Sequence, residues 1–179
     1  INHMFADSNL DLFYVKKRNE INQAAVSATD FTHTKINSFG MEYTMERDEF
    51  NHTLIGLDYT DEDMNELSYG TSFQHTNKIK QAYLSSTQSI SDGLKVNLGI
   101  RAQNHSTYDS FTSGNIGVNY YLHPRFVVST SLAKSFRAPD ATDLFGYGGN
   151  SKLNPEKSRT AEISMRYRIS DDASFVGTL

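Results

Sequence analysis

The sequence predicts an all-β protein, folded as an antiparallel up-and-down meander of long strands. Apolar and polar residues alternate with a period of two over many stretches, which places each kind on its own face of a sheet. All three prolines lie outside these stretches, as the hydrogen-bonded ladder of a strand requires. Aromatic residues make up 12% of the chain, which together with the alternation weighs against disorder.

Eight stretches are predicted to be strands, and a ninth begins near Ser174. Many of them exceed the common strand length of about 5–6 residues and match the roughly 9–11 residues of a tilted membrane-spanning strand. The predicted strands lie at 9–19, 36–46, 50–60, 74–90, 94–105, 113–122, 125–137 and 158–170.

The alternation is clear in five of these stretches and noisier over 9–20, 50–60 and 76–90. It places apolar residues on one face of each clear strand and mainly polar residues on the other, with Lys134 breaking the pattern near the end of its strand. The apolar sets are Phe39, Met41, Tyr43 and Met45; Leu94, Val96, Leu98 and Ile100; Ile116, Val118 and Tyr120; Phe126, Val128 and Leu132; and Ile163, Met165 and Tyr167.

The connections between the predicted strands are alternately short and long. In an antiparallel meander, successive connections lie at opposite ends of the sheet, so one end carries tight turns and the other carries long loops. This asymmetry is typical of outer-membrane β-barrels, and the fold class is therefore predicted to be part of a transmembrane barrel. The short turns are 47–49, 91–93, 123–124 and 171–173, and the long loops are 20–35, 61–73, 106–112 and 138–157.

The composition and net charge of the chain exclude several other classes of protein. The chain has no cysteine, so disulfide scaffolds and thiolate chemistry are excluded, and its net charge of −4 does not indicate a nucleic-acid partner. No apolar run approaches the ~18 residues of a membrane helix. The six histidines are scattered, so no catalytic residues, no metal site and no cofactor are predicted.

The two ends of the sequence favour a segment of a longer protein. The first ten residues, "INHMFADSNL", do not form a signal peptide, and the last seven, "ASFVGTL", stop within a new strand.

One Gly/Pro-bearing stretch, "SFRAPDATDLFGYGGNSKLNPEKS" at 135–158, carries a more specific signal. Its "SFRAP", "LFG", "GN" and "LNPEKS" segments resemble, in order, a loop in the barrel of TonB-dependent outer-membrane receptors of the cobalamin or siderophore type. Ser151 departs from the proline common in that family. The resemblance implies a barrel of about 22 strands with a plugged lumen. Residues 1–179 would then be a partial β-barrel domain of eight to nine strands, with the plug domain absent.

The resemblance also implies a function and partners. Such a receptor would import a large scarce ligand, cobalamin or a ferric siderophore, across the bacterial outer membrane without acting as an enzyme. It would contact outer-membrane lipid, and it would receive energy from the TonB complex through parts of the protein that lie outside this chain. Two alternatives stay open on the residues alone: an outer-membrane barrel enzyme, and a soluble β-rich binding module or adhesin.

Two sets of residues are candidates for binding. The first set lies in the loop at 138–157 and would contact the ligand at the extracellular mouth, or else hold the loop through hydrogen bonds and an ion pair of Arg137. The second set is acidic and offers a weak calcium site, although a solvated acidic loop tip is the favoured interpretation. The first set is Arg137, Asp140, Asp143, Tyr147 and Asn150, and the second is Asp58, Asp61, Asp63 and Glu66.

Overall fold

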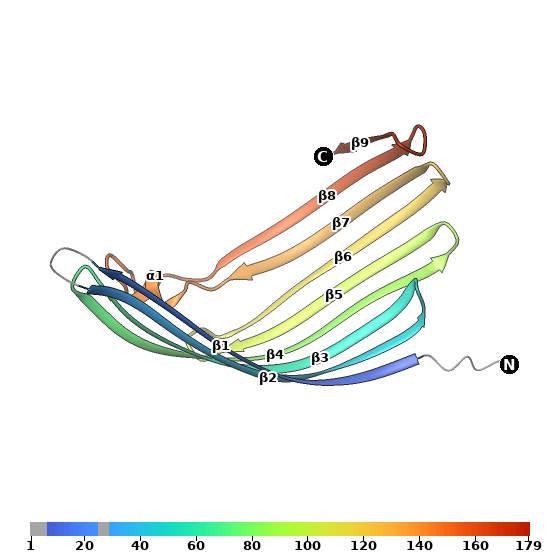
Figure 1. Ribbon diagram of the computed structural model, residues 1–179. Helices are drawn as coiled ribbons and strands as arrows, with labels where there is room; N and C mark the ends of the chain where they lie inside the picture. The colour runs from blue at the N-terminus through green and yellow to red at the C-terminus, as the bar shows by residue number, and fades with distance from the viewer. Residues whose placement is uncertain (1–6, 25–28) are drawn as a thin grey trace.

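The computed structural model describes residues 7–24 and 29–179, so residues 25–28 and the first six residues of the N-terminal stretch lie outside it. Nine strands form a single antiparallel sheet in chain order, which confirms the predicted meander (Figure 1). The strands are β1 (Asp7–Ala24), β2 (Thr29–Asp48), β3 (Asn51–Ser68), β4 (Thr71–Ser91), β5 (Leu94–His105), β6 (Ser110–His123), β7 (Phe126–Arg137), β8 (Glu156–Arg168) and β9 (Ser174–Thr178).

Helix is nearly absent from the described part of the chain. The short helix α1 (Ala141–Phe145) lies between β7 and β8. No helix in the described residues is long and apolar enough to cross a membrane.

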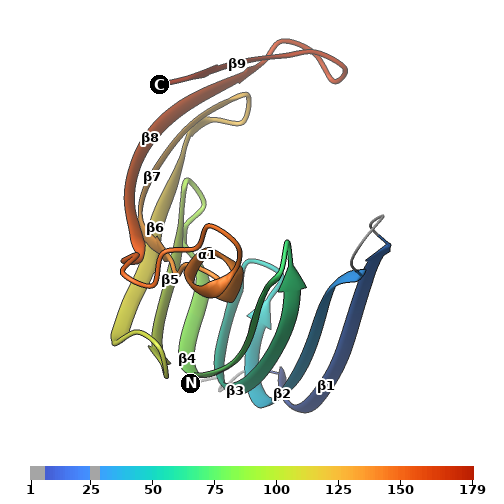
Figure 2. The same ribbon diagram turned by 90° about the vertical axis from the view of Figure 1, so that its left-hand side faces the viewer.

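The sheet curves into an open arc, and α1 lies on its concave side (Figure 2). Residues opposite one another in the register share a face, so the alternating sets of neighbouring strands align across the sheet. Leu98 of β5 lies opposite Ile116 of β6, which in turn lies opposite Leu132 of β7. These residues form part of an apolar band on the convex face, whereas α1 packs against the opposite face.

The apolar band is not covered by a second layer. Ile100, Ile116 and Ile163 are 50%, 43% and 41% exposed, and Leu12 on β1 reaches 77%. A soluble sheet protein would bury such residues in a core, because exposed apolar surface is unfavourable in water. The convex face is therefore built to meet an apolar environment.

The concave face is polar and satisfies many of its own hydrogen bonds. Gln103 donates to Oε1 of Gln81 at 2.8 Å, and Gln81 donates to Oδ2 of Asp58 at 2.8 Å, which joins β5, β4 and β3. Tyr83 donates to Oε1 of Glu42 at 2.6 Å across β3, where Gly56 leaves room for the tyrosine ring. These series of hydrogen bonds stabilise the polar face of the sheet without a packed core.

The connections at one end of the sheet are tight, as predicted. They comprise residues 49–50, 92–93, 124–125 and 169–173. In the first of them, Asp48 accepts hydrogen bonds from the backbone N–H of Phe50 at 2.9 Å and from Nδ2 of Asn51 at 2.7 Å. Oδ1 of Asn51 accepts in turn from the backbone N–H of Ser89, which ties this turn to β4.

Two of the predicted long loops are wrong. Described residues of the expected loop at 20–35 belong to β1 and β2, and the expected loop at 61–73 belongs to β3 and β4 apart from a turn at Tyr69 and Gly70. Polar residues predominate on both faces of these strand segments, so the alternation on which the prediction relied is lost there. The strands continue because their backbones still pair in register, with Asp63 opposite Thr76.

The aromatic row formed by Tyr14, Phe39 and Tyr59 marks where the convex face changes character. These residues lie at one register across β1, β2 and β3, and the rings of Phe39 and Tyr59 are 5.3 Å apart. Beyond the row, convex positions hold charged residues such as Lys35 and Asp63, which face each other in the register. The strands β1 to β4 therefore extend well past the apolar band at the end of the sheet that carries α1.

The other two long connections fit the prediction better. Residues 106–109 connect β5 to β6, so the expected loop at 106–112 is shorter than predicted. The expected loop at 138–157 is present over residues 138–155, with α1 inside it.

Candidate functional site

The loop between β7 and β8 begins with a capped helical turn. Asp140 is the N-cap of α1: its Oδ1 accepts from the backbone N–H of Asp143 at 2.8 Å, and Oδ2 of Asp143 accepts from the backbone N–H of Asp140 at 3.1 Å. This reciprocal pair satisfies two backbone donors that a helix start leaves free. Pro139, just before the cap, cannot donate to a strand ladder and so helps end β7.

The rest of the loop is also held by its own backbone. The N–H of Gly146 donates to the carbonyl of Thr142 at 2.9 Å, and the N–H of Asn150 donates to the carbonyl of Asp143 at 2.8 Å. Gly148 has a φ of 74°, a left-handed conformation that glycine adopts without strain. Oδ1 of Asn150 accepts from the backbone N–H of Lys152 at 3.0 Å, so this side chain shapes the turn. The connection is an ordered loop.

The loop folds inward onto the concave face of the projecting β3–β4 hairpin (Figure 2). Thr142 donates a hydrogen bond of 2.9 Å to Oε2 of Glu66, which is only 5% exposed. The ring of Phe145 lies 4.9 Å from that of His75 and 6.1 Å from that of Phe73. The loop is therefore fixed to strands that precede it by some seventy residues.

A cavity of about 200 Å³ lies between this loop and the sheet. The strands β3, β4 and β5 supply one wall, and the loop supplies the other. Its lining includes Met64, His75, His105, Tyr108, Asp140 and Leu144.

Two polar atoms of the cavity lining are buried without a hydrogen-bond partner among the residues that the structure describes. They are Nδ1 of His105 and Oη of Tyr108. Buried polar groups are nearly always paired in folded proteins, so two unpaired groups on residues that line one cavity mark it as a candidate site for a polar ligand. Burial raises the pKa of Tyr108, and the negative charges of Asp143 and Asp140 raise it further, so the phenol stays a neutral donor.

Aromatic rings extend the site along the concave face. The ring of Phe136 stacks on that of Phe111 at 4.5 Å and meets the edge of His105 at 6.0 Å. Lys157 lies over Phe111, with its Nζ 5.9 Å from the ring centroid. The site combines flat apolar surfaces with a few polar groups, a lining typical of pockets for organic ligands.

The structure separates the predicted ligand-binding residues into different roles. Asp140 and Asp143 are brought together by the helix cap, and Asn150 shapes the following turn. Tyr147 lies apart from them at the hairpin tip, where it is 65% exposed and its ring is 5.1 Å from that of Tyr69. Arg137 is exposed at the end of β7, opposite Glu156. Ligand binding by these five residues stays a prediction.

The acidic residues proposed for calcium do not converge. Asp58 and Glu66 belong to the concave set of β3, whereas Asp61 and Asp63 belong to its convex set, because β3 is a strand and not a loop. Within the described residues, no group of three or more His, Asp or Glu side chains could hold a metal ion.

The sequence prediction named Glu66 only as a calcium candidate, and it did not place His75, His105, Tyr108 and Phe145 in a site. Part of the signal was present in β4. Phe73, His75 and Ile79 lie on one face of this strand, and the residues between them that point to the other face are polar. This signal was hidden because 61–73 was expected to be a loop, which separates these residues from the stretch at 138–157.

The comparisons with known proteins agree with this geometry. A model of the family described as TonB dependent receptor-like, beta-barrel matches residues 2–179. The chain belongs to this family. Members of the family are β-barrel proteins of the outer membrane, and they are receptors and transporters.

Individual relatives of this TonB-dependent receptor chain are more distant. It is 29% identical over 113 residues to the vitamin B12 transporter BtuB of Vibrio vulnificus, which covers 60% of the chain and 18% of the transporter. It superposes on the siderophore receptor PirA of Acinetobacter baumannii with a TM-score of 0.76 and 18% identity. That match covers 98% of the chain and 32% of the receptor.

A variant of the ferric enterobactin receptor PfeA of Pseudomonas aeruginosa, in complex with enterobactin, gives a TM-score of 0.78 at 17% identity. It covers 97% of the chain and 32% of that receptor. At this identity the structural matches establish the fold. The chain spans about a fifth of the length of the transporter and about a third of each receptor.

Proposed function

We propose that this chain forms part of the wall and the extracellular mouth of an outer-membrane receptor, which takes up a large ligand such as cobalamin or a ferric siderophore. The observation that carries the proposal is the inward-folded loop, whose cavity is lined by His105 and Tyr108. Nδ1 of His105 and Oη of Tyr108 have no hydrogen-bond partner among the described residues. The relatives named above, a vitamin B12 transporter and siderophore receptors, support this class of ligand.

The two ends of the sheet support an orientation in the membrane. Outer-membrane barrels have short periplasmic turns and longer extracellular connections. The end with the tight turns would then face the periplasm, and the end with α1 and the projecting β3–β4 hairpin would face the exterior. The apolar convex band would contact lipid, and the polar concave face would line the lumen.

The proposed mechanism is binding followed by gated passage through the lumen, with no bond chemistry. The ligand would contact the aromatic rings and the polar side chains that line the cavity. Energy for passage would come from the TonB complex, which would act through parts of the protein that this chain does not contain. The exposed apolar band argues against the soluble adhesin, since such a surface promotes aggregation in water.

Uptake and binding by whole cells test this proposal. The full-length receptor would be produced in cells that lack their own cobalamin and siderophore receptors, and radiolabelled cyanocobalamin and ferric enterobactin would be added separately. We expect uptake of one of them, and loss of that uptake in cells without TonB. Failure to take up either compound, with the receptor present in the outer membrane, would contradict the proposed ligand class.

A double variant locates the binding site. His105→Gln with Tyr108→Phe changes the groups at the cavity and should weaken binding of the transported compound about tenfold, because each hydrogen bond lost contributes about 0.5–1.5 kcal/mol. His123→Gln with Tyr121→Phe makes the same exchanges at the opposite end of the sheet and should leave affinity unchanged. Equal affinity for both double variants would remove the cavity from the proposal.

A further inference from the structure

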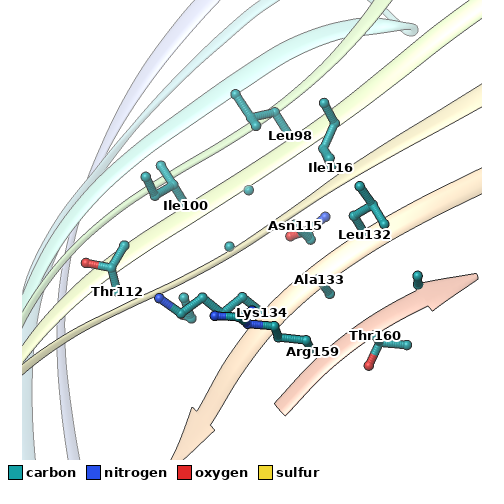
Figure 3. A pocket seen from close by; sticks show the side chains of 14 residues that line it. Leu98, Ile100, Thr112, Asn115, Ile116, Leu132, Ala133, Lys134, Arg159 and Thr160 are labelled. Carbon is teal, nitrogen blue, oxygen red and sulfur yellow. The ribbon is translucent and has the colours of Figure 1, made fainter. Parts of the chain in front are cut away.

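A groove of about 650 Å³ crosses the convex face between β5 and β8, on the opposite side of the sheet from the proposed ligand cavity (Figure 3). Its sides are mostly aliphatic, formed by Leu98 and Ile100 of β5, Ile116 of β6 and Leu132 of β7. Gly114 and Ala161, which have little or no side chain, leave space between them. The groove is therefore long, apolar and open to the surroundings of the barrel.

Two cations lie together at the end of this groove nearest α1. Lys134 of β7 and Arg159 of β8 are direct partners in the register, and Figure 3 shows their side chains next to each other. Both side chains are exposed, and neither forms an ion pair with another residue in the described ranges 7–24 and 29–179. Like charges opposite each other on neighbouring strands are destabilising, so this arrangement favours an anion held between them.

The position of the cation pair matches the edge of a membrane. Lys134 lies three residues before the end of β7, and the next convex pair along the strands is Leu132 with Ala161. A charged residue on the lipid face of a barrel is costly at the bilayer midplane, but the cost falls almost to zero near the interface. An apolar groove that ends in two cations at this level is complementary to a lipid with an acyl chain and an anionic headgroup.

We propose that this groove binds one membrane lipid with a phosphate-bearing, negatively charged headgroup. The phosphate lies between Lys134 and Arg159, and an acyl chain lies along Leu98, Ile100, Ile116 and Leu132. The guanidinium fork and the ammonium group both donate to phosphate oxygens, and burial of methylene groups in the groove adds to the affinity. The inference rests on the proposed placement in the outer membrane, with the α1 end outside.

The occupant is a lipid and not free phosphate. Two exposed cations alone hold a small anion weakly, because solvent and salt screen the interaction. The groove supplies the additional apolar contact, and only a molecule that carries both an anionic headgroup and an acyl chain can use both parts.

Native mass spectrometry of the full-length receptor in detergent tests the site. Dioleoylphosphatidylglycerol, which carries an anionic phosphodiester, would be titrated against the receptor, with dioleoylphosphatidylcholine and glycerol 3-phosphate as comparison compounds. We expect one tightly retained phosphatidylglycerol, weaker retention of phosphatidylcholine, and no retention of glycerol 3-phosphate. Equal retention of the two lipids would overturn the proposal, and so would binding of glycerol 3-phosphate as tight as that of the lipid.

Three variants separate the headgroup contact from the acyl contact. Lys134→Gln with Arg159→Gln should weaken phosphatidylglycerol binding about thirtyfold, since each basic residue near a membrane surface contributes a factor of about five. Ala161→Phe fills the groove and should weaken it about tenfold, by displacing roughly two methylene groups. Lys78→Gln with Lys80→Gln removes two other convex lysines on β4 and is the matched control, with no expected change.

Folding and function are checked separately from lipid binding. Each variant should migrate as a folded barrel on an unheated gel, and its uptake of the radiolabelled ligand should match the original receptor, because the groove and the cavity lie on opposite faces. Retention of lipid by the Lys134→Gln, Arg159→Gln receptor at the original affinity would overturn the inference while leaving the proposed function standing. A receptor that binds lipid as expected but takes up no ligand would contradict the proposed function and leave the lipid inference standing.

Discussion

Thr142 of α1 donates a hydrogen bond of 2.9 Å to the buried carboxylate of Glu66 on β3, although the two residues are 76 positions apart in the sequence. Thr32 of β2 donates to the same oxygen at 3.4 Å. Gly146 lies against this carboxylate too, since a Cβ there would come within 3.3 Å of Oε1. One buried acid therefore links the loop to two strands at the end of the sheet that carries α1.

Replacing Thr142 by Val should release the loop from Glu66, because valine has nearly the same side-chain volume but cannot donate the hydrogen bond. A hydrogen bond to a charged group contributes about 1.5–3 kcal/mol, and its loss leaves a buried carboxylate with one donor fewer. We expect the amides of residues 141–150 to exchange with deuterium at least about tenfold faster. Hydrogen exchange with mass spectrometry measures this, with Thr160→Val on β8 as the control; unchanged exchange in Thr142→Val would show that the bond does not hold the loop.

The reciprocal hydrogen bonds between Asp140 and Asp143 at the start of α1 lead to a second, independent prediction. Asp140→Ala removes the acceptor for the backbone N–H of Asp143 and should destabilise the helical turn by about 1 kcal/mol. Asp140→Asn keeps an oxygen that can accept the same bond, because asparagine is an equally good N-cap. Faster amide exchange at 143–146 is expected for the alanine variant only, and the same rise in both variants would assign the effect to charge.

Gly56 and Tyr83 should be energetically coupled. A Cβ at Gly56 would collide with Cζ of the Tyr83 ring, so the ring must move and give up its hydrogen bond to Glu42. Gly56→Ala should destabilise the barrel by about 1–3 kcal/mol, as overpacking does. A double-mutant cycle with Tyr83→Ala, measured by urea unfolding in micelles, should show that the alanine at position 56 costs much less once the ring is gone; additive effects would contradict the contact.

Asp48 predicts a pH dependence at the turn between β2 and β3. Its hydrogen bonds from the backbone N–H of Phe50 and from the Asn51 side chain lower its pKa below the ordinary 3.8. A depressed folded-state pKa means that the stabilisation is fully present above the unfolded value near 3.8 and is lost as pH falls through the folded value. Unfolding measured between pH 2 and 5 should lose stability below about pH 4, and less so in Asp48→Asn. An identical decline in both proteins would exclude this turn as a source.

Much of the wall could be predicted because alternation is a local signal. The stretch from Leu94 to Gln103 shows one apolar and one polar face without reference to any other part of the chain, and β5 follows it closely. The signal failed at 61–73, where polar residues predominate on both faces of β3 and β4. The partial burial of their concave face comes from contact with the distant loop at 138–155, which no local pattern can mark.

The loop at 138–155 shows the same division on a smaller scale. Pro139, the glycines and the Asn-Pro pair indicated an ordered turn between two strands, and the structure has one. The helical turn inside it depended on the contact between Asp140 and Asp143, and its inward fold depended on Glu66, His75 and Phe73.

The sequence by itself determined a meander of long strands with one apolar and one polar face, because a period of two is set by the geometry of each strand alone. It also determined the family, through a short run of residues whose order is distinctive. Only the tertiary structure decided which residues meet in the cavity beside α1 and in the groove of the convex face. Those contacts join strands that are distant in the chain, and they depend on register and curvature, which no local pattern encodes.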